Sequence, residues 1–228
     1  MVITIDGPSG SGKSTVSKLL AKRLNFLYLD TGAMYRVVAL QAVRKGIACK
    51  EEKRLGEMCQ GLALRFEYEG DVCKIFSGNE DVSQAIRTPE MDILASRISA
   101  VNEVREAMTS LQRKIAQRGN IVAEGRDMGT VVFPDADFKI FLTASVETRA
   151  ERRYLERISR GETVSRDGVF QDLKRRDEQD TSRPIAPLRL AEDAKLIDST
   201  MLSPDQVVEM ILEGLRTKGL DEFLVTET

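Results

Sequence analysis

The apolar residues near the start of the chain follow two different periods. Residues 2–5 form a short β-branched run, which is typical of a buried strand. Apolar residues then recur at helical spacing over 13–24. A second short run at 26–29 is followed by a helix expected from about 33 to 45, which ends near Gly46. The N-terminal part is therefore predicted to alternate strand and helix.

The stretch from 47 to 98 has a different texture. It begins with a helical pattern and continues with two segments at 64–70 and 72–78 that resemble short strands. Gly70 and Asp71 separate these segments, which predicts a β-hairpin. A hairpin that interrupts an alternation of strand and helix indicates an inserted subdomain.

The alternating pattern returns after two further predicted helices. Pro89 begins a further predicted helix, and 101–117 is a longer one. Apolar strands are predicted at 120–125, 138–144 and 194–200. We therefore expect an α/β protein with a central five-stranded parallel sheet and helices on both faces, in which ligands bind at the carboxyl ends of the strands.

Ser145 is predicted to begin a helix after the strand at 138–144, and charged residues dominate the stretch 149–183. So many charges cannot be mostly buried, so the segment is predicted to be a solvated helical arm or a mobile flap. The sequence SPDQ at 203–206 predicts a capping box for a last helix, which runs to about Lys218. Residues 219–228 are expected to form a loose acidic tail.

Composition narrows the class of protein. The content of 42% hydrophobic and 31% charged residues fits a water-soluble globular protein, and the net charge of −2 provides no overall basic field for a nucleic-acid polymer. We find no membrane span and no signal peptide, and we expect a cytoplasmic protein with three reduced cysteines. Histidine is absent, so catalytic triads and histidine-ligated zinc are excluded.

A glycine-rich loop lies between the first predicted strand and the first predicted helix. Gly7, Gly12, Lys13 and Ser14 match the Walker A spacing G-x-x-x-x-G-K-S. Glycines let backbone amides approach an anion, and the helix adds its positive N-terminal end. In this pattern the lysine reaches the β- and γ-phosphates and the hydroxyl of Ser14 binds Mg²⁺. The sequence therefore predicts triphosphate binding with Mg²⁺ as the cofactor.

Arginines near strand ends indicate what the phosphoryl group is transferred to. Arg36, Arg126 and Arg183 each lie at a predicted strand end or at the edge of a motif. If the acceptor is itself a phosphate, its oxygen is already deprotonated at neutral pH and no general base is required. Guanidinium groups that bring two anions together then supply the catalysis. A switch GTPase is disfavoured because no Asn-Lys-x-Asp stretch is present.

Four stretches in order carry a family resemblance: IDGPSGSGKST, LDTGAMYR, EGRDMGTVVFPDA and RRDEQDTSRPIAPL. Together they closely resemble bacterial-type cytidylate kinases, which are P-loop nucleoside monophosphate kinases, over essentially the whole chain. The resemblance implies transfer of the γ-phosphoryl group of ATP to CMP or dCMP. It also implies a monophosphate-binding region at 36–98, a lid at 150–183, and a core formed by 1–35, 99–149 and 184–218.

The resemblance also assigns site residues. Catalysis is assigned to Lys13, Arg126, Asp127 and Arg183. ATP binding is assigned to Gly7, Pro8, Ser9, Gly10, Ser11, Gly12, Lys13, Ser14, Thr15, Arg153 and Arg157, with Ser14 on the metal. CMP binding is assigned to Thr31, Arg36, Ser96, Arg105, Arg126, Asp127, Arg176, Asp180 and Arg183.

Within the CMP site, the expected tasks differ. The arginines Arg36, Arg126 and Arg183 hold the phosphate. Cytosine is read by Ser96, Arg105 and Asp127, and the sugar hydroxyls by Asp180 with Arg176. Arg152, Arg153 and Arg157 belong to the lid helix and close on the ATP phosphates, although surface ion pairs explain them equally well.

Two positions depart from other family members. Thr31 stands where some members have serine, and its hydroxyl is retained. Glu124 replaces an aspartate, so only a contact with the water shell of Mg²⁺ is carried over.

Two alternatives stay open at this point. A kinase of the same build could use another acceptor, such as UMP or a small alcohol, and a nucleotide-dependent switch could use the loop without catalysis. We expect a monomer whose residues 150–182 are more mobile than the sheet.

Overall fold

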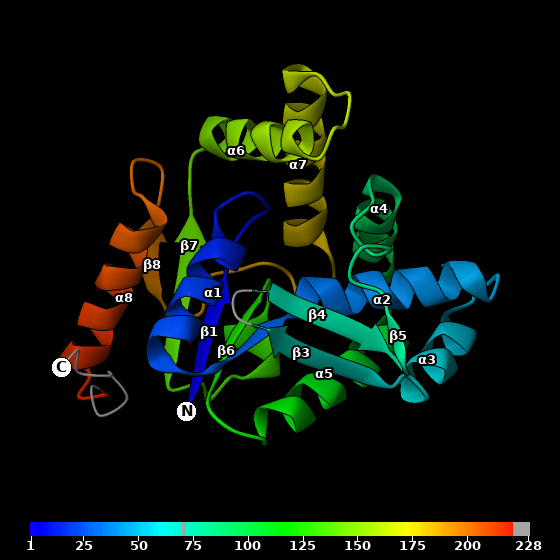
Figure 1. The fold of residues 1–228 in the computed structure, drawn as a ribbon, viewed down its shortest axis with the longest axis horizontal. Helices are drawn as coiled ribbons and strands as arrows, with labels where there is room; N and C mark the ends of the chain where they lie inside the picture. The colour runs from blue at the N-terminus through cyan, green and yellow to red at the C-terminus, as the bar shows by residue number, and fades with distance from the viewer. Residues whose placement is uncertain (70–71, 221–228) are drawn as a thin grey trace. The chain divides into compact units, whose positions relative to one another are not determined.

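The computed structural model describes residues 1–69 and 72–220. It forms two compact units, one of Met1–Leu29 with the described residues from Gly119 onward, and one of Asp30–Arg118. The elements are, in chain order, β1 (Val2–Asp6), α1 (Lys13–Leu24), β2 (Leu27–Asp30), α2 (Thr31–Arg44), α3 (Glu52–Gln60), β3 (Leu64–Glu69), β4 (Val72–Ser77), β5 (Glu80–Asp81), α4 (Pro89–Ile98), α5 (Asn102–Ala116), β6 (Ile121–Gly125), η1 (Met128–Val132), β7 (Phe138–Thr143), α6 (Val146–Ser159), α7 (Arg166–Ser182), β8 (Lys195–Asp198) and α8 (Pro204–Thr217) (Figure 1).

The first unit is built on a five-stranded sheet with the strand order β2-β6-β1-β7-β8. Strand β1 pairs in parallel with β6 and β7, and β7 pairs in parallel with β8, as the alternating pattern predicts. All five residues of β6 are buried, which explains its unbroken apolar character. Because β1 is central, the loop that follows it lies at the carboxyl edge of the sheet, between its two neighbours.

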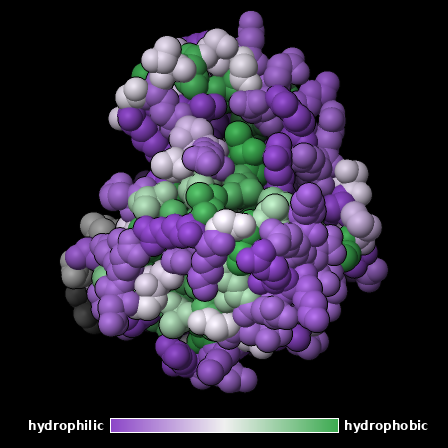
Figure 2. Space-filling view, turned by 90° about the vertical axis from the view of Figure 1, so that its right-hand side faces the viewer, coloured by the Kyte–Doolittle hydropathy of each residue, from purple (hydrophilic) through white to green (hydrophobic). Residues whose placement is uncertain are grey.

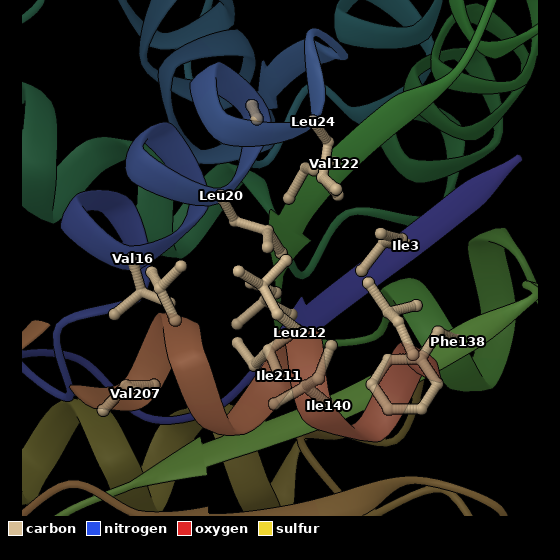
Figure 3. Close-up of a cluster of buried hydrophobic side chains, with 14 of the residues drawn as sticks. Ile3, Val16, Leu20, Leu24, Val122, Phe138, Ile140, Val207, Ile211 and Leu212 are labelled. Carbon is tan, nitrogen blue, oxygen red and sulfur yellow. The ribbon is translucent and has the colours of Figure 1, made fainter. Parts of the chain in front are cut away.

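Helices α1 and α8 cover one face of this sheet. Their apolar residues interdigitate with side chains of β1, β6 and β7, as Figure 3 shows for Leu20, Ile211 and Ile140. Ile3, Leu20, Ile140 and Ile211 are all at most 1% exposed, so this cluster is closed to water. The sheet edge that carries the glycine loop therefore rests on a dry and well-packed core.

Short polar side chains define where several of these helices begin. Ser203 accepts a hydrogen bond from the Gln206 amide while the Gln206 side chain accepts one from the Ser203 amide, which confirms the predicted capping box of α8. Ser145 caps α6 as expected, by accepting a hydrogen bond from the Thr148 amide. Asp30 caps α2 in the same way, so that helix begins at Thr31, two residues before the predicted start.

The second unit combines helices with a small antiparallel sheet of order β3-β4-β5. The pairing of β3 with β4 confirms the predicted hairpin, and its turn at residues 70 and 71 lies outside the described residues. Strand β5 was not predicted, because a two-residue strand has no recognisable period. Ile75 and Val82 join Val37 of α2 in a buried cluster that fastens this sheet to the helix.

The charged segment of the first unit forms the helices α6 and α7, so the predicted helical arm is confirmed. The two helices pack against each other (Figure 1), with Ala150, Val169 and Leu173 buried between charged neighbours. The turn η1, a single π-helical turn, was not predicted. Most of the surface drawn in Figure 2 is hydrophilic, in line with the high content of charged residues.

Other sequence predictions concern boundaries and membranes. Most of the tail predicted at 219–228 lies outside the described residues. Over the described part of the chain, no helix is both long and apolar enough to cross a membrane. The compact second unit includes α5, which contacts α3, whereas the predicted monophosphate-binding region ends at residue 98. The functional division into core, binding region and lid stays a prediction.

Candidate functional site

The glycine loop follows β1 as the Walker pattern predicts, and α1 begins at Lys13. Glycine is required at two positions of the loop, because other backbone atoms come too close for a side chain. A Cβ on Gly7 would lie 2.0 Å from the Leu142 carbonyl oxygen, and one on Gly10 would lie 2.8 Å from the Arg149 carbonyl oxygen. Both residues also have positive φ angles, of 150° and 76°. The loop is therefore pressed against the end of β7 and the first turn of α6.

Lys13 is buried within this loop. Its Nζ donates to the Pro8 carbonyl oxygen at 2.7 Å and to Ser11 Oγ at 3.4 Å. Burial lowers the pKa of Lys13 well below its usual range, and the positive charge of Arg126 lowers it further. An anion that enters the loop would act against both effects, because its negative charge favours the charged form of the lysine.

Ser14, the predicted metal ligand, contacts a buried carboxylate. Ser14 Oγ donates to Glu124 Oε2 at 3.0 Å, and the hydroxyl of Tyr28 donates to Glu124 Oε1. Glu124 and Tyr28 are each 4% exposed. The structure thus places Glu124, for which the sequence carried only a water-shell contact, directly beside the hydroxyl of Ser14.

Asp6 at the end of β1 is a second buried carboxylate. It accepts hydrogen bonds from the amides of Met128 at 2.8 Å and Gly129 at 2.7 Å, which fixes the first turn of η1. Burial raises the pKa of Asp6 to about 6, although the two amides oppose this rise. Asp6 therefore ties the strand that carries the glycine loop to the segment that carries Arg126 and Asp127.

The predicted acceptor arginines of the first unit are held by predicted acceptor carboxylates. Arg126 Nε donates to Asp180 Oδ2 at 2.7 Å, and Arg183 Nη2 donates to Asp127 Oδ1 at 3.4 Å. The Arg183 and Asp127 side chains are only 7% and 3% exposed. These pairs join the segment after β6 to helix α7 and to the residue that follows α7. Residues about fifty positions apart in sequence therefore form one cluster.

Electrostatics link this cluster to the glycine loop. Burial opposes the charge of Arg126, but the carboxylate of Asp180 outweighs it and the pKa of Arg126 is raised. Burial likewise opposes ionisation of Asp180, yet Arg126 and Arg176 together lower its pKa. Arg126, Arg176 and Asp180 also act on Lys13. In the first unit, Lys13, which is predicted to bind the triphosphate, therefore interacts electrostatically with three residues that are predicted to bind CMP.

The second unit carries the other predicted CMP residues. Thr31 and Arg36 lie on α2, and Arg36 Nε donates to Asp92 Oδ1 on α4 at 2.7 Å. Ser96 lies one helical turn beyond Asp92. Arg105 on α5 is 4% exposed and donates to the Ser99 carbonyl oxygen at 3.1 Å. Contacts of α2 with α4 and α5 bring this group together within its unit.

The predicted lid arginines take part in ion pairs within the helical arm. Arg153 pairs with Glu156 at 2.8 Å, and Arg157 pairs with Glu162 at 2.7 Å and with Asp172 at 3.7 Å. Both are therefore satisfied in the structure by neighbouring carboxylates, and their role toward ATP stays a prediction.

Ser14 and Glu124 offer the kind of ligands that Mg²⁺ prefers. Their adjacent oxygens are hard donors, and Mg²⁺ usually takes one or two such groups and fills its remaining positions with phosphate oxygens and water. The described residues contain no group of three or more acidic, cysteine or histidine side chains that could hold a metal by itself. The adjacent oxygens of Ser14 and Glu124 fit a magnesium ion that takes its other ligands from phosphate and water.

Several site residues have no signal in the sequence that separates them from their neighbours. Tyr28 and Asp6 look like ordinary members of apolar strands, and Asp92 looks like a surface residue of α4. Arg149 is one of many arginines in the charged segment. Only the strand-end position of Asp6, directly before the glycine loop, could have drawn attention to it.

Sequence comparisons with known proteins agree on one family. The sequence model of the family described as Cytidylate kinase matches residues 3–217. The curated Cytidylate kinase of Geobacter sp. (strain M21) is 49% identical over 211 residues, which cover 92% of this chain and 91% of that protein. The Cytidylate kinase of Geobacter sulfurreducens is 51% identical over 218 residues, which cover 96% and 94%. A solved structure of an uncharacterized protein from Eubacterium ventriosum covers 95% of this chain and 99% of its own with a TM-score of 0.54 and 15% identity, a likeness of fold alone.

Proposed function

Since the chain belongs to the cytidylate kinase family, we propose that it transfers the γ-phosphoryl group of ATP to CMP or dCMP, giving ADP and CDP or dCDP. One observation supports this reaction beyond family membership. The buried Lys13 of the glycine loop lies in the same electrostatic field as Arg126 and Arg176. A loop that binds one triphosphate does not need two further arginines acting on its lysine, whereas a site that brings two anions together does.

In this proposal the glycine loop holds ATP. Backbone amides of the loop and the N-terminal end of α1 face the phosphates. Lys13 leaves the Pro8 carbonyl oxygen and binds the β- and γ-phosphates, whose negative charge favours the charged form of the lysine. Ser14 and Glu124 would hold Mg²⁺, which would neutralise part of the negative charge on the phosphoryl oxygens.

The acceptor needs no general base. The second pKa of a phosphate monoester is about 6, so an oxygen of CMP is already an anion at neutral pH. This oxygen attacks the γ-phosphorus in line with the bond to the β–γ bridging oxygen, which breaks as the new bond forms. Arg126, Arg183 and Arg36 hold the two anions together, which agrees with a chain that contains no histidine.

Cytosine and the sugar are recognised by different sets of side chains. Asp127 accepts a hydrogen bond from the amino group of cytosine, and Ser96 and Arg105 donate to its ring acceptors. Asp180, supported by Arg176, accepts hydrogen bonds from the sugar hydroxyls. UMP carries a carbonyl oxygen in place of the amino group, and the carboxylate of Asp127 repels this oxygen.

The helical arm serves as the lid. Closure of α6 and α7 over the phosphates excludes water that would otherwise accept the phosphoryl group. Arg153 and Arg157 then exchange their glutamate and aspartate partners for phosphate oxygens.

A panel of monophosphates tests the proposal. Purified protein is incubated with MgATP and CMP, dCMP, UMP, AMP or GMP, and ADP formation is followed. We expect kcat/KM for CMP or dCMP to exceed that for UMP by about 10- to 100-fold, the cost of one misplaced buried polar contact. Tight ATP binding without ADP production from any acceptor would favour a switch protein instead, and a preference for another acceptor would overturn the assignment of CMP.

A further inference from the structure

Arg149, which no sequence argument assigned to the site, is a buried cation with three acceptors. Its Nε donates to the Ala144 carbonyl oxygen at 3.0 Å, and its Nη1 donates to the Ser9 carbonyl oxygen at 3.1 Å and to Asp177 Oδ2 at 2.6 Å. The Arg149 side chain is 7% exposed. One guanidinium thus joins the end of β7, the glycine loop and the lid helix α7.

The contact with Ser9 orients a peptide group of the loop. In a planar trans peptide the C=O and N–H bonds point in opposite directions. Because the Ser9 carbonyl faces Arg149, the amide of Gly10 in the same peptide faces the other way. The next turn of the loop is held similarly, since the Ser11 carbonyl oxygen accepts hydrogen bonds from Ser199 Oγ at 3.1 Å and from Arg152 Nη1 at 3.5 Å. Donors from Arg149, Arg152 and Ser199 therefore hold the two carbonyls, and the amides of Gly10 and Gly12 point away from these donors.

The position of Arg149 depends in turn on Asp177. A buried guanidinium requires a counter-charge, and Asp177 is the carboxylate that supplies it in the structure. The other carboxylate oxygen of Asp177, Oδ1, is buried and has no hydrogen-bond partner among the described residues. Arg149 is therefore the contact that fixes this carboxylate, and the carboxylate fixes Arg149 against the loop.

We propose that Arg149 is a positioning residue that orients the Ser9–Gly10 peptide for the ATP phosphates, and that Asp177 makes this orientation depend on the place of α7. The inference rests on the proposed function of the loop as the ATP cradle. Arg149 acts on the loop through its Nε and Nη1 donors, which are directed at backbone carbonyls and at Asp177. When α7 carries Asp177 away, the charge that draws Arg149 toward α7 is lost and the Gly10 amide is no longer held in place.

The structure offers a matched control pair. Glu151 on α6 and Arg166 at the start of α7 form an ion pair at 2.5 Å that joins the same two helices. Their side chains are 40% and 65% exposed, and the pair contacts no residue of the glycine loop in the structure. Loss of this pair removes a link between α6 and α7 and leaves the orientation of the loop unchanged.

The test measures the dissociation constant for MgATP by calorimetry without an acceptor, so that no turnover occurs. We expect Asp177→Asn and Arg149→Lys each to raise this constant about tenfold, the effect of one lost charge-assisted hydrogen bond. Glu151→Gln should stay within about twofold of wild type. Circular dichroism of each variant confirms that the fold is retained.

The combination of variants separates positioning from simple stability. In Arg149→Gln protein, the further change Asp177→Asn should cost little, because the link is already broken. Additive losses, or a wild-type dissociation constant in both Asp177→Asn and Arg149→Lys, would overturn the inference. Failure of the wild-type protein to bind MgATP would instead overturn the proposed function, so the two failures are distinguishable.

Discussion

Asp6 should make the stability of the fold depend on pH in a range where few groups titrate. Its pKa is raised from 3.8 to about 6 by burial, so the folded chain binds this proton more tightly than the unfolded chain does. The stabilisation is fully present below the unfolded pKa and is lost as the pH rises through 6. Because the chain contains no histidine, no unperturbed side chain contributes a slope between pH 5 and pH 7.

The size of the effect follows from the two pKa values. When the pH falls from 7 to 5, the raised pKa of Asp6 increases the free energy of unfolding by about 1.3 kcal/mol. Lys13, with its lowered pKa, contributes a slope of the opposite sign. The reference is therefore Asp6→Asn, which retains Lys13 and cannot ionise at residue 6.

Urea unfolding followed by circular dichroism at pH 5, 6 and 7 measures this difference. The free energy of unfolding of the wild type should gain about 1.3 kcal/mol relative to Asp6→Asn between pH 7 and pH 5. Equal pH dependence in the two proteins would refute the reasoning, since it would mean that the buried carboxyl of Asp6 titrates near its ordinary pKa.

Three further changes probe the site itself. Arg183→Ala should lower kcat/KM for CMP by about 100-fold or more, or roughly 3 kcal/mol, with an unchanged circular dichroism spectrum, and full turnover would contradict a role in holding the acceptor. Tyr28→Phe removes a buried hydrogen bond to Glu124 and should lower the free energy of unfolding by about 1–3 kcal/mol in urea titrations, whereas wild-type stability would show that the hydroxyl is dispensable. Gly10→Ala places a methyl group against the Arg149 carbonyl at a positive φ and should weaken MgATP binding at least tenfold in calorimetry, and unchanged affinity would mean that the loop adjusts freely.

The regular elements were predictable because they follow local rules. Helix α1 has the bounds that its apolar period predicts, and the capping box at Ser203 marks the start of α8. The Walker spacing likewise places Lys13 at the start of a helix. These features depend on residues within a few positions of one another, which a sequence displays directly.

The parts that were missed depend on contacts between distant residues. The turn η1 follows from the carboxylate of Asp6, which accepts hydrogen bonds from amides more than a hundred positions away. Arg149 and Arg153 look alike in sequence, yet one is buried against the glycine loop and the other pairs with a neighbouring glutamate. Only tertiary packing distinguishes the two arginines, so the sequence pattern alone assigned no role to Arg149.

Helix α7 carries two carboxylates, one helical turn apart, that hold two different arginines. Asp177 pairs with Arg149 on the side of the glycine loop, and Asp180 pairs with Arg126 in the cluster proposed for the acceptor. A helix moves nearly as a rigid rod, so a displacement that lengthens one pair also disturbs the other. Coupling free energies are reciprocal. If bound CMP changes the affinity for ATP by some factor, bound ATP must change the affinity for CMP by the same factor.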